Sequence, residues 1–430
     1  MIFRRFGMII LFISATVVSA DDADATTGFM GISWSGLGSL EAGQLVKWHW
    51  RGEELDHTWL QQTKVRLVAR KEVTPWLDVV LGFEGAQWFE TYDEFSNNPV
   101  EIPQKNFSFI IHQSEAFFDF GDLLKIHCGV FPYKYNPEVQ NLGEYLFRTG
   151  AYPGFIINEF DFAIARLTGL WLNNRLLDGK LNNDVIFNME TDYKPFRDIS
   201  VSYIGSYSPH PAITLGYGVN LSHLISVNEK FTTPKLPGSW YIDSTSKDTV
   251  NLTFRGVKPM VRLTFDIKRF FDMPIFGSED LKLYGELAIL GVKNYQLYYD
   301  TLAQRIPIMF GFNFPAFKIL DVMSWEFEWY GSPYPNSYQN AFSIQPYLPR
   351  PIPDLPQKEY SDYDYLHDNW KWSVYAKKTF ANSFSIIGQV ARDHFRSHIK
   401  YPYNIDREEG LTKPGPIWYN GHWYWMLKVA

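Results

Sequence analysis

The sequence predicts an all-β fold: an antiparallel, up-and-down transmembrane β-barrel of about 16 strands, with a range of about 14 to 18. Three observations support this prediction. Apolar and polar residues alternate over long stretches, these stretches exceed the length of ordinary strands, and tight connections alternate with long ones. Together they indicate strands that each expose one apolar and one polar face.

Alternation is clearest over residues 260–268, where Val261, Leu263, Phe265 and Ile267 alternate with polar residues. Successive side chains of a strand point to opposite faces, so one face of this segment is apolar and the other is polar. The same period of two recurs in 76–85, 123–130, 198–207 and 422–429. A water-soluble β-sandwich alternates as well, so alternation alone does not identify a membrane barrel.

Strand length and aromatic placement favour the membrane barrel. The stretches 58–73, 76–91 and 281–295 are longer than soluble strands, and a tilted strand needs about 9 to 11 residues to cross a bilayer. Aromatic residues gather near the ends of the apolar faces, where Trp and Tyr meet lipid headgroups. They include Trp88, Phe89, Trp325, Phe327, Trp329, Trp370 and Trp372.

The connections assign the two ends of the barrel. Tight turns at 74–75, 121–122 and 381–382 fit the periplasmic end of such barrels, and long connections such as 92–104, 133–160 and 331–369 fit the outer end. The predicted strands are 42–50, 58–73, 76–91, 105–120, 123–132, 161–173, 182–193, 198–207, 212–226, 250–268, 281–295, 305–315, 317–330, 370–380, 383–397 and 421–430. Splitting 250–268 or adding 28–36 would change the count.

The amino terminus has the layout of a secretory signal peptide. Arg4 and Arg5 precede an apolar stretch from Met8 to Val18, and small residues follow up to Ala20. We therefore expect a signal peptide at 1–20, a periplasmic segment at 21–41 and a single barrel domain at 42–430. The net charge of −7 argues against nucleic acid as a partner, because phosphate binding requires a basic excess.

If the polar faces line the lumen, neighbouring strands should place opposite charges together. An in-register hairpin across 74–75 would set Arg70 opposite Asp78 and Lys64 opposite Glu84, and the turn at 121–122 would set Asp119 opposite Lys125. Such pairs stiffen the wall, and they are also candidates for tuning selectivity. The full set of lumen candidates is Lys64, Arg66, Arg70, Asp78, Glu84, Asp119, Lys125, Glu326 and Glu328.

Motifs for chemistry are sparse, so we expect no enzyme, no cofactor and no metal site. Glu326 and Glu328 share a strand face about 7 Å apart, a separation that paired catalytic carboxylates also use, but lumen wall is the favoured interpretation. His394 and His398 have the i, i+4 spacing of a helical metal site, yet they continue a strand pattern. Neither pair predicts catalysis.

Two long loops are candidates for narrowing the barrel. Residues 331–369 contain seven prolines, which favours a stiff, extended segment. Residues 133–160 are rich in aromatic side chains. These would either stack on sugar rings or, as we favour, pack against one another so that the loop forms a self-packed cap. The aromatic candidates are Tyr133, Tyr135, Tyr145, Phe147 and Tyr152.

In this patterning, residues 42–430 resemble the Gram-negative outer-membrane β-barrel proteins, in particular porin-like channels. The resemblance implies an outer-membrane location, the lipid bilayer and the barrel-assembly machinery as partners, and it allows a homotrimer. It implies passive or weakly selective passage of small hydrophilic solutes, with saccharides as candidates. A structural or polysaccharide-binding outer-membrane barrel is the alternative, and an enzyme embedded in the outer membrane is a less favoured one. Such proteins commonly end on an aromatic residue, whereas this chain stops at Ala430, which indicates an atypical or truncated terminal signal.

Overall fold

A computed structural model gives the structure of the chain. It describes residues 31–47, 49–50, 53–54, 59–88, 107–149, 152–153, 165–191, 197–232, 240–242, 246–247, 249–251, 253, 255–271, 274–292, 301–330, 370–381, 383–392 and 423–430. Among these residues, no helix has the length and apolar character needed to cross a membrane. The fold is described below for these residues only.

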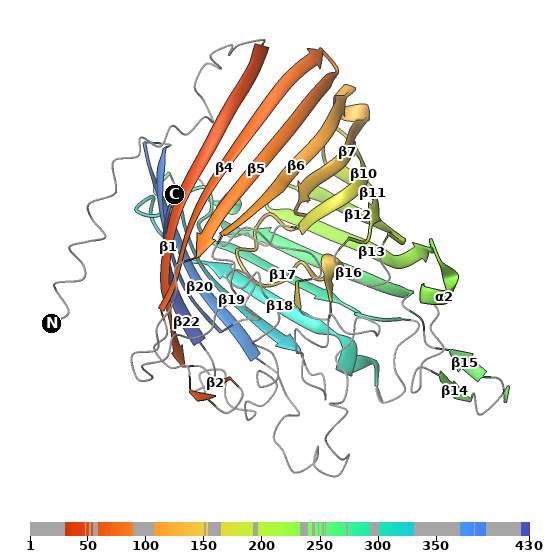
Figure 1. Cartoon of the computed structure of the whole chain (residues 1–430). Coiled ribbons are helices and arrows are strands. Elements are labelled where there is room, and N and C mark those ends of the chain that lie inside the picture. Colours follow the sequence, from red (N-terminus) through yellow and green to blue (C-terminus); the bar gives the residue numbers. More distant parts are fainter. Residues whose placement is uncertain are drawn as a thin grey trace.

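Sixteen strands of the described residues close into one antiparallel barrel, as predicted (Figure 1). They are β1 Ile32–Lys47, β4 Trp59–Thr74, β5 Leu77–Trp88, β6 Phe107–Asp119, β7 Lys125–Tyr133, β10 Ala165–Leu176, β11 Leu181–Met189, β12 Ile199–His210, β13 Ile213–Ile225, β16 Gly256–Asp266, β17 Lys282–Ala288, β18 Pro307–Asn313, β19 Val322–Tyr330, β20 Trp370–Phe380, β21 Phe384–Arg392 and β22 Trp423–Val429. Each barrel strand pairs with the next one along the chain, and β22 pairs with β1.

Among the described residues, three small hairpins and five short helices lie outside the barrel sheet. The hairpins are β2 His49–Trp50 with β3 Glu53–Glu54, β8 Arg148–Thr149 with β9 Tyr152–Pro153, and β14 Trp240–Ile242 with β15 Thr249–Asn251. The helices are η3 Gly121–Leu123, η4 Tyr145–Phe147, α2 Glu229–Thr232, η5 Ile267–Phe270 and η6 Leu302–Arg305. The predicted strand 250–268 is therefore wrong at its start, because 249–251 pairs outside the barrel.

The predicted domain boundary at residue 42 is also too late, because β1 starts at Ile32. The outward positions of this strand include Gly36 and Gly38, and an apolar Leu37 points inward opposite Arg66. These residues weaken the alternation of apolar and polar side chains on which the prediction relied. Part of the predicted periplasmic segment therefore belongs to the barrel.

The barrel has an apolar outside and a polar inside. On β4 the outward side chains Val65 and Leu67 are 52% and 49% exposed, whereas the inward Lys64 is 6% exposed. The same contrast holds across the barrel, where large apolar side chains dominate the outer surface and many buried residues are polar or charged. A water-soluble protein has the opposite arrangement, and a barrel surrounded by lipid requires this one.

Aromatic rings gather at the turn end of the outward faces of β5 and β6. Trp76, in the turn between β4 and β5, stacks on Phe118 and Phe120 with ring centroids 6.1 Å apart in each case. Such rings suit the interface between lipid and water. Trp325 and Phe327, 5.0 Å apart, lie instead in the middle of β19.

Candidate functional site

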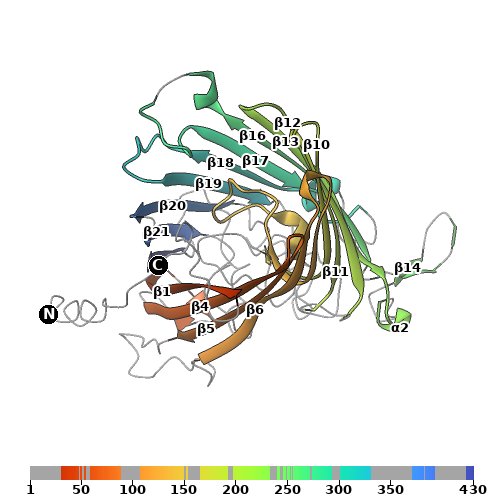
Figure 2. The ribbon, with the colours of Figure 1, turned by 90° about the horizontal axis from the view of Figure 1, so that it is seen from above.

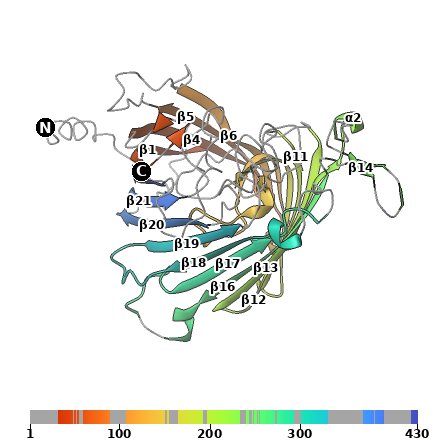
Figure 3. The same cartoon turned by 90° about the horizontal axis from the view of Figure 1, so that it is seen from below.

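The segment that follows β7 turns back into the barrel instead of standing outside it. In Figure 2 and Figure 3 this gold segment lies inside the ring of strands. From Tyr135 to Phe147 most of its residues are buried, and Pro137 is the exposed exception. We call residues 134–147 the inner loop. It narrows the lumen, and its contacts with the wall define the candidate site.

The carboxylate of Glu326, on β19, holds one part of the inner loop. It accepts backbone N–H groups of Gln140 at 2.5 Å, Asn141 at 2.8 Å and Leu142 at 2.8 Å. The hydroxyl of Tyr284, on β17, donates to the same carboxylate at 3.0 Å. Glu326 is fully buried, so these four donors replace the water that its charge would otherwise require.

A second carboxylate, Glu286 on β17, holds the flanking residues of the loop. It accepts the Tyr135 hydroxyl at 2.5 Å, the Asn136 side-chain amide at 2.9 Å, and the backbone N–H groups of Glu144 at 3.1 Å and Tyr145 at 2.9 Å. Burial and the negative charge of Glu286 raise the pKa of Tyr135 well above its usual value. This hydroxyl therefore remains a donor across the physiological pH range.

Glu328 completes the attachment, because it accepts the hydroxyl of Tyr145 at 3.0 Å. The predicted lumen carboxylates Glu326 and Glu328 thus both contact the inner loop, and neither lines an open passage. Glu286, with the same role, was missed from the sequence. It lies on the polar parity of the predicted strand 281–295, which is the signal that could have revealed it.

Glycine makes two of these contacts possible. A side chain at Gly311 would place its Cβ 2.1 Å from the ring of Tyr284, so only glycine lets that ring cross β18 toward Glu326. Gly143 has a φ of +84°, and a Cβ there would lie 2.7 Å from the terminal methyl of Met309. Gly311 thus lets two wall residues approach closely, and Gly143 lets the inner loop approach the wall.

The aromatic candidates of the loop belong to an apolar core inside the barrel. Tyr133, Tyr135, Tyr145 and Phe147 pack there with wall side chains, and each is at most 5% exposed. The core also contains Val139, Leu142, Leu146, Leu167, Ile186, Ile204, Met260, Met309 and Tyr330. These four rings pack against the wall and present no open face to a sugar. The side chain of Tyr152 lies outside the described residues.

On the wall away from the loop, the predicted charge ladder is present with a different register. Lys125 lies opposite Asp119 and pairs with it at 3.0 Å, as expected. Arg70 lies opposite Val80 rather than Asp78, so its predicted register is wrong, but it still forms an ion pair with Asp78. Lys64 is opposite Ala86 rather than Glu84, so that prediction is wrong. The turn lies at 75–76 rather than 74–75, with Thr74 opposite Leu77, and the pairing shifts again between Glu72 and Thr74.

Glu84 instead pairs with Arg66, its direct cross-strand partner, at 2.7 Å. Lys64 lies 3.6 Å from Glu41 on β1, and Lys428 on β22 lies 3.7 Å from the same oxygen atom. Glu41 was missed because the first strand was predicted to start at residue 42.

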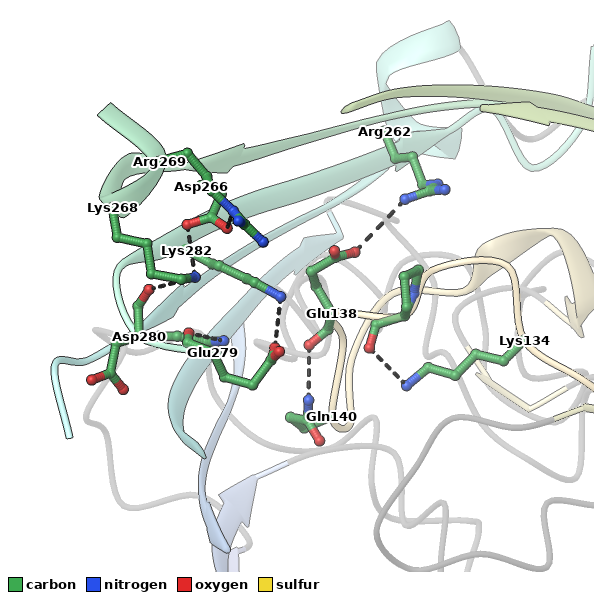
Figure 4. A network of polar contacts seen from close by, with 12 residues as sticks. Lys134, Glu138, Gln140, Arg262, Asp266, Lys268, Arg269, Glu279, Asp280 and Lys282 are labelled. Carbon is green, nitrogen blue, oxygen red and sulfur yellow. Dashed lines mark hydrogen bonds and ion pairs between the residues drawn. The ribbon is translucent and has the colours of Figure 1, made fainter. Parts of the chain in front are cut away.

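A second polar network joins the tip of the inner loop to β16 (Figure 4). Lys134 donates to the backbone oxygens of Val139 at 2.6 Å and Pro137 at 3.4 Å, which holds the tip in a tight turn. Glu138 faces Arg262 across 3.8 Å. This ion pair is longer than a hydrogen bond, so it restrains the tip less than the carboxylates of β17 and β19 restrain the rest of the loop.

Further ion pairs of the same view stiffen the turn between β16 and β17. Lys268 and Arg269 both contact Asp266, at 2.8 Å and 3.3 Å, and Lys282 contacts Glu279 at 2.8 Å (Figure 4). In the part of the chain that the structure describes, no group of three or more His, Cys, Asp or Glu residues could hold a metal ion. His394 and His398, like the loop 331–369, lie outside the described residues.

No protein-family model and no curated protein matches the chain. Among solved structures, Salmonella typhi OmpF in complex with daunomycin is 8% identical, with a TM-score of 0.47 and coverage of 93% of this chain and 97% of that chain. An anion-selective porin from Comamonas acidovorans is 10% identical, with a TM-score of 0.45 and coverage of 93% and 98%. A triple mutant of Rhodopseudomonas blastica porin is 8% identical, with a TM-score of 0.43 and the same coverage. These values are too low to carry a conclusion, and the description of the barrel rests on its own strand pairing.

Proposed function

We propose that this protein is an outer-membrane channel for the passive or weakly selective passage of small hydrophilic solutes. The observation that carries the proposal is the inverted barrel, which has an apolar outer surface and a polar inner wall. A closed barrel of 16 strands is wide enough to leave an aqueous passage. The inner loop fills part of that width, so the passage is narrower than the barrel and favours small solutes.

The test is conductance of the purified protein in a planar bilayer, combined with swelling of liposomes in sugars of increasing size. We expect discrete ion-conducting steps, and swelling that slows as the sugar becomes larger. A barrel that inserts into the bilayer and passes neither ions nor sugars would overturn the proposal.

A second candidate is a structural or polysaccharide-binding barrel, favoured by the apolar core that occupies one side of the lumen. A core of this kind would suit a barrel that is closed rather than open. The two candidates differ in conductance: the second predicts electrical silence together with glycan binding by the intact protein. Glycan binding measured on a conducting barrel would favour the channel with an additional role for its outer loops.

A further inference from the structure

The wall opposite the inner loop carries ion pairs that share one orientation. The pairs are Lys64–Glu41, Arg66–Glu84 and Arg70–Asp78. In each pair the basic side chain is more exposed than the carboxylate, at 7% against 0%, 17% against 0%, and 55% against 16%. The side chains of Arg66 and Arg70 are therefore more accessible to the water in the lumen than their carboxylate partners, whereas Lys64 and Glu41 are both buried.

The three basic residues form a line along one strand. Lys64, Arg66 and Arg70 occupy positions of the same parity on β4, so their side chains point to the same face, and the inward Val68 separates the second from the third. We call these three residues the β4 cationic track. At about 3.3 Å per residue the track is about 20 Å long, which is a large part of the thickness of a membrane core.

The carboxylates of the opposite wall do not balance the track. Glu286 and Glu326 are buried beneath the inner loop and accept its N–H and O–H donors. Two more exposed carboxylates, Glu279 beside β17 and Asp119 on β6, each have a lysine partner, at 2.8 Å and 3.0 Å. On β4 itself, the exposed Glu72 lies beyond Arg70, at the turn end. Between residues 64 and 70, the charges that β4 points into the lumen are therefore all positive.

We propose that the passage prefers small anions over cations, and that the β4 cationic track is the surface along which they move. This inference rests on the proposed channel function and adds the class of solute to it. The ligand class is small inorganic and carboxylate anions, because the guanidinium groups of Arg66 and Arg70 supply N–H donors and positive charge, to which the buried ammonium group of Lys64 adds its charge. The preference would arise although the whole chain carries a net charge of −7.

The experiment is the reversal potential of the full-length protein in a planar bilayer under a KCl gradient. We expect the wild-type reversal potential to have the sign of the chloride equilibrium potential. The double substitution Arg66→Gln with Arg70→Gln should lower the chloride-to-potassium permeability ratio by about two- to fivefold, since a unit charge 4 Å from an ion in water changes its local concentration by about fivefold before screening. Lys318→Gln is the matched control, because Lys318 is an exposed residue of the turn between β18 and β19. It should leave the ratio unchanged.

Asp78→Asn should change the chloride-to-potassium permeability ratio in the opposite direction. It also tests the proposal if the double variant does not insert into the bilayer. Removing the carboxylate behind Arg70 should raise the preference for chloride. A conducting wild-type protein that prefers potassium, or equal shifts in the double variant and in Lys318→Gln, would overturn the track and leave the channel intact. An electrically silent wild-type protein would overturn the channel and, with it, this inference.

Discussion

Two walls of the same barrel use their inward carboxylates in different ways. On β17 and β19, Glu286 and Glu326 accept N–H and O–H groups of the inner loop, with most distances between 2.5 and 3.0 Å. On β1 and β5, Glu41 and Glu84 face lysine or arginine side chains. The comparison shows two uses of a buried carboxylate. One that accepts backbone N–H groups holds a loop in place, whereas one paired with a lysine or arginine side chain contributes to the electrostatic field of the passage.

The largest effect is expected from Glu326→Ala. Four donors, three of them backbone N–H groups of Gln140, Asn141 and Leu142, would lose their acceptor inside the barrel. Hydrogen bonds to a buried charge are worth about 1.5 to 3 kcal/mol each, and unpaired donors add a penalty, so we expect a loss of about 3 kcal/mol or more. Thermal unfolding in detergent measures the loss. Glu72→Ala, on the other wall, is the control, and equal melting temperatures for the two variants would contradict the anchoring role.

The next effect is expected from Gly311→Ala. The new methyl group would overlap the ring of Tyr284 and push it away from Glu326, at a cost of about 1 to 3 kcal/mol. Gly388→Ala is a matched control, because a Cβ at Gly388 on β21 meets no atom within 4 Å. Unfolding in detergent compares the two. A variant at position 311 as stable as the one at position 388 would argue against the close approach of ring and strand.

A smaller effect is expected from Tyr135→Phe, which removes one charge-assisted hydrogen bond to Glu286 and should cost about 1.5 to 3 kcal/mol. The wild-type contribution should depend on pH. Because the pKa of Tyr135 is raised in the folded protein, its contribution is fully present below about pH 10 and declines above it, where the unfolded phenol ionises. Unfolding measured from pH 8 to pH 11 should show the two proteins converging, and a constant difference would contradict the assignment.

The smallest effect on stability is expected from Arg70→Gln. Its ion pair with Asp78 is more than half exposed on the basic side, and such pairs contribute about 0 to 1 kcal/mol. The melting temperature should therefore barely change, while the reversal potential moves toward the potassium equilibrium potential. A large loss of stability would mean that the β4 cationic track is a structural support rather than a surface for ions.

The sequence was sufficient for the parts of the barrel that obey a local rule. Alternation of apolar and polar residues predicted the strand count, and the inward parity of Arg66, Glu84 and Glu326 followed from it. It failed at β1, where Gly36, Gly38 and Leu37 break the alternation. The position of residues 134–147 inside the barrel could not be predicted, because it depends on Glu286 and Glu326, which are more than 140 residues away along the chain.

The hairpin register shows the same limit on a smaller scale. Pairing from a turn at 74–75 placed Lys64 opposite Glu84, but the turn lies at 75–76 and the pairing shifts between Glu72 and Thr74, so Arg66 takes that position. A period of two fixes which face a side chain takes and leaves its partner undetermined. The partner depends on the geometry of the turn.

The pairing of β22 with β1 bears on the order in which the protein can fold. Glu41 and Lys428 are direct partners in this pairing, so the ring is completed by residues from nearly opposite ends of the chain. Until β22 has paired with both of its neighbours, β1 and β21 present unpaired edges. Joining such distant segments carries the largest cost in loop-closure entropy in the barrel. The final strand thus turns a curved, aggregation-prone sheet into a closed wall, and folding cannot finish before it arrives.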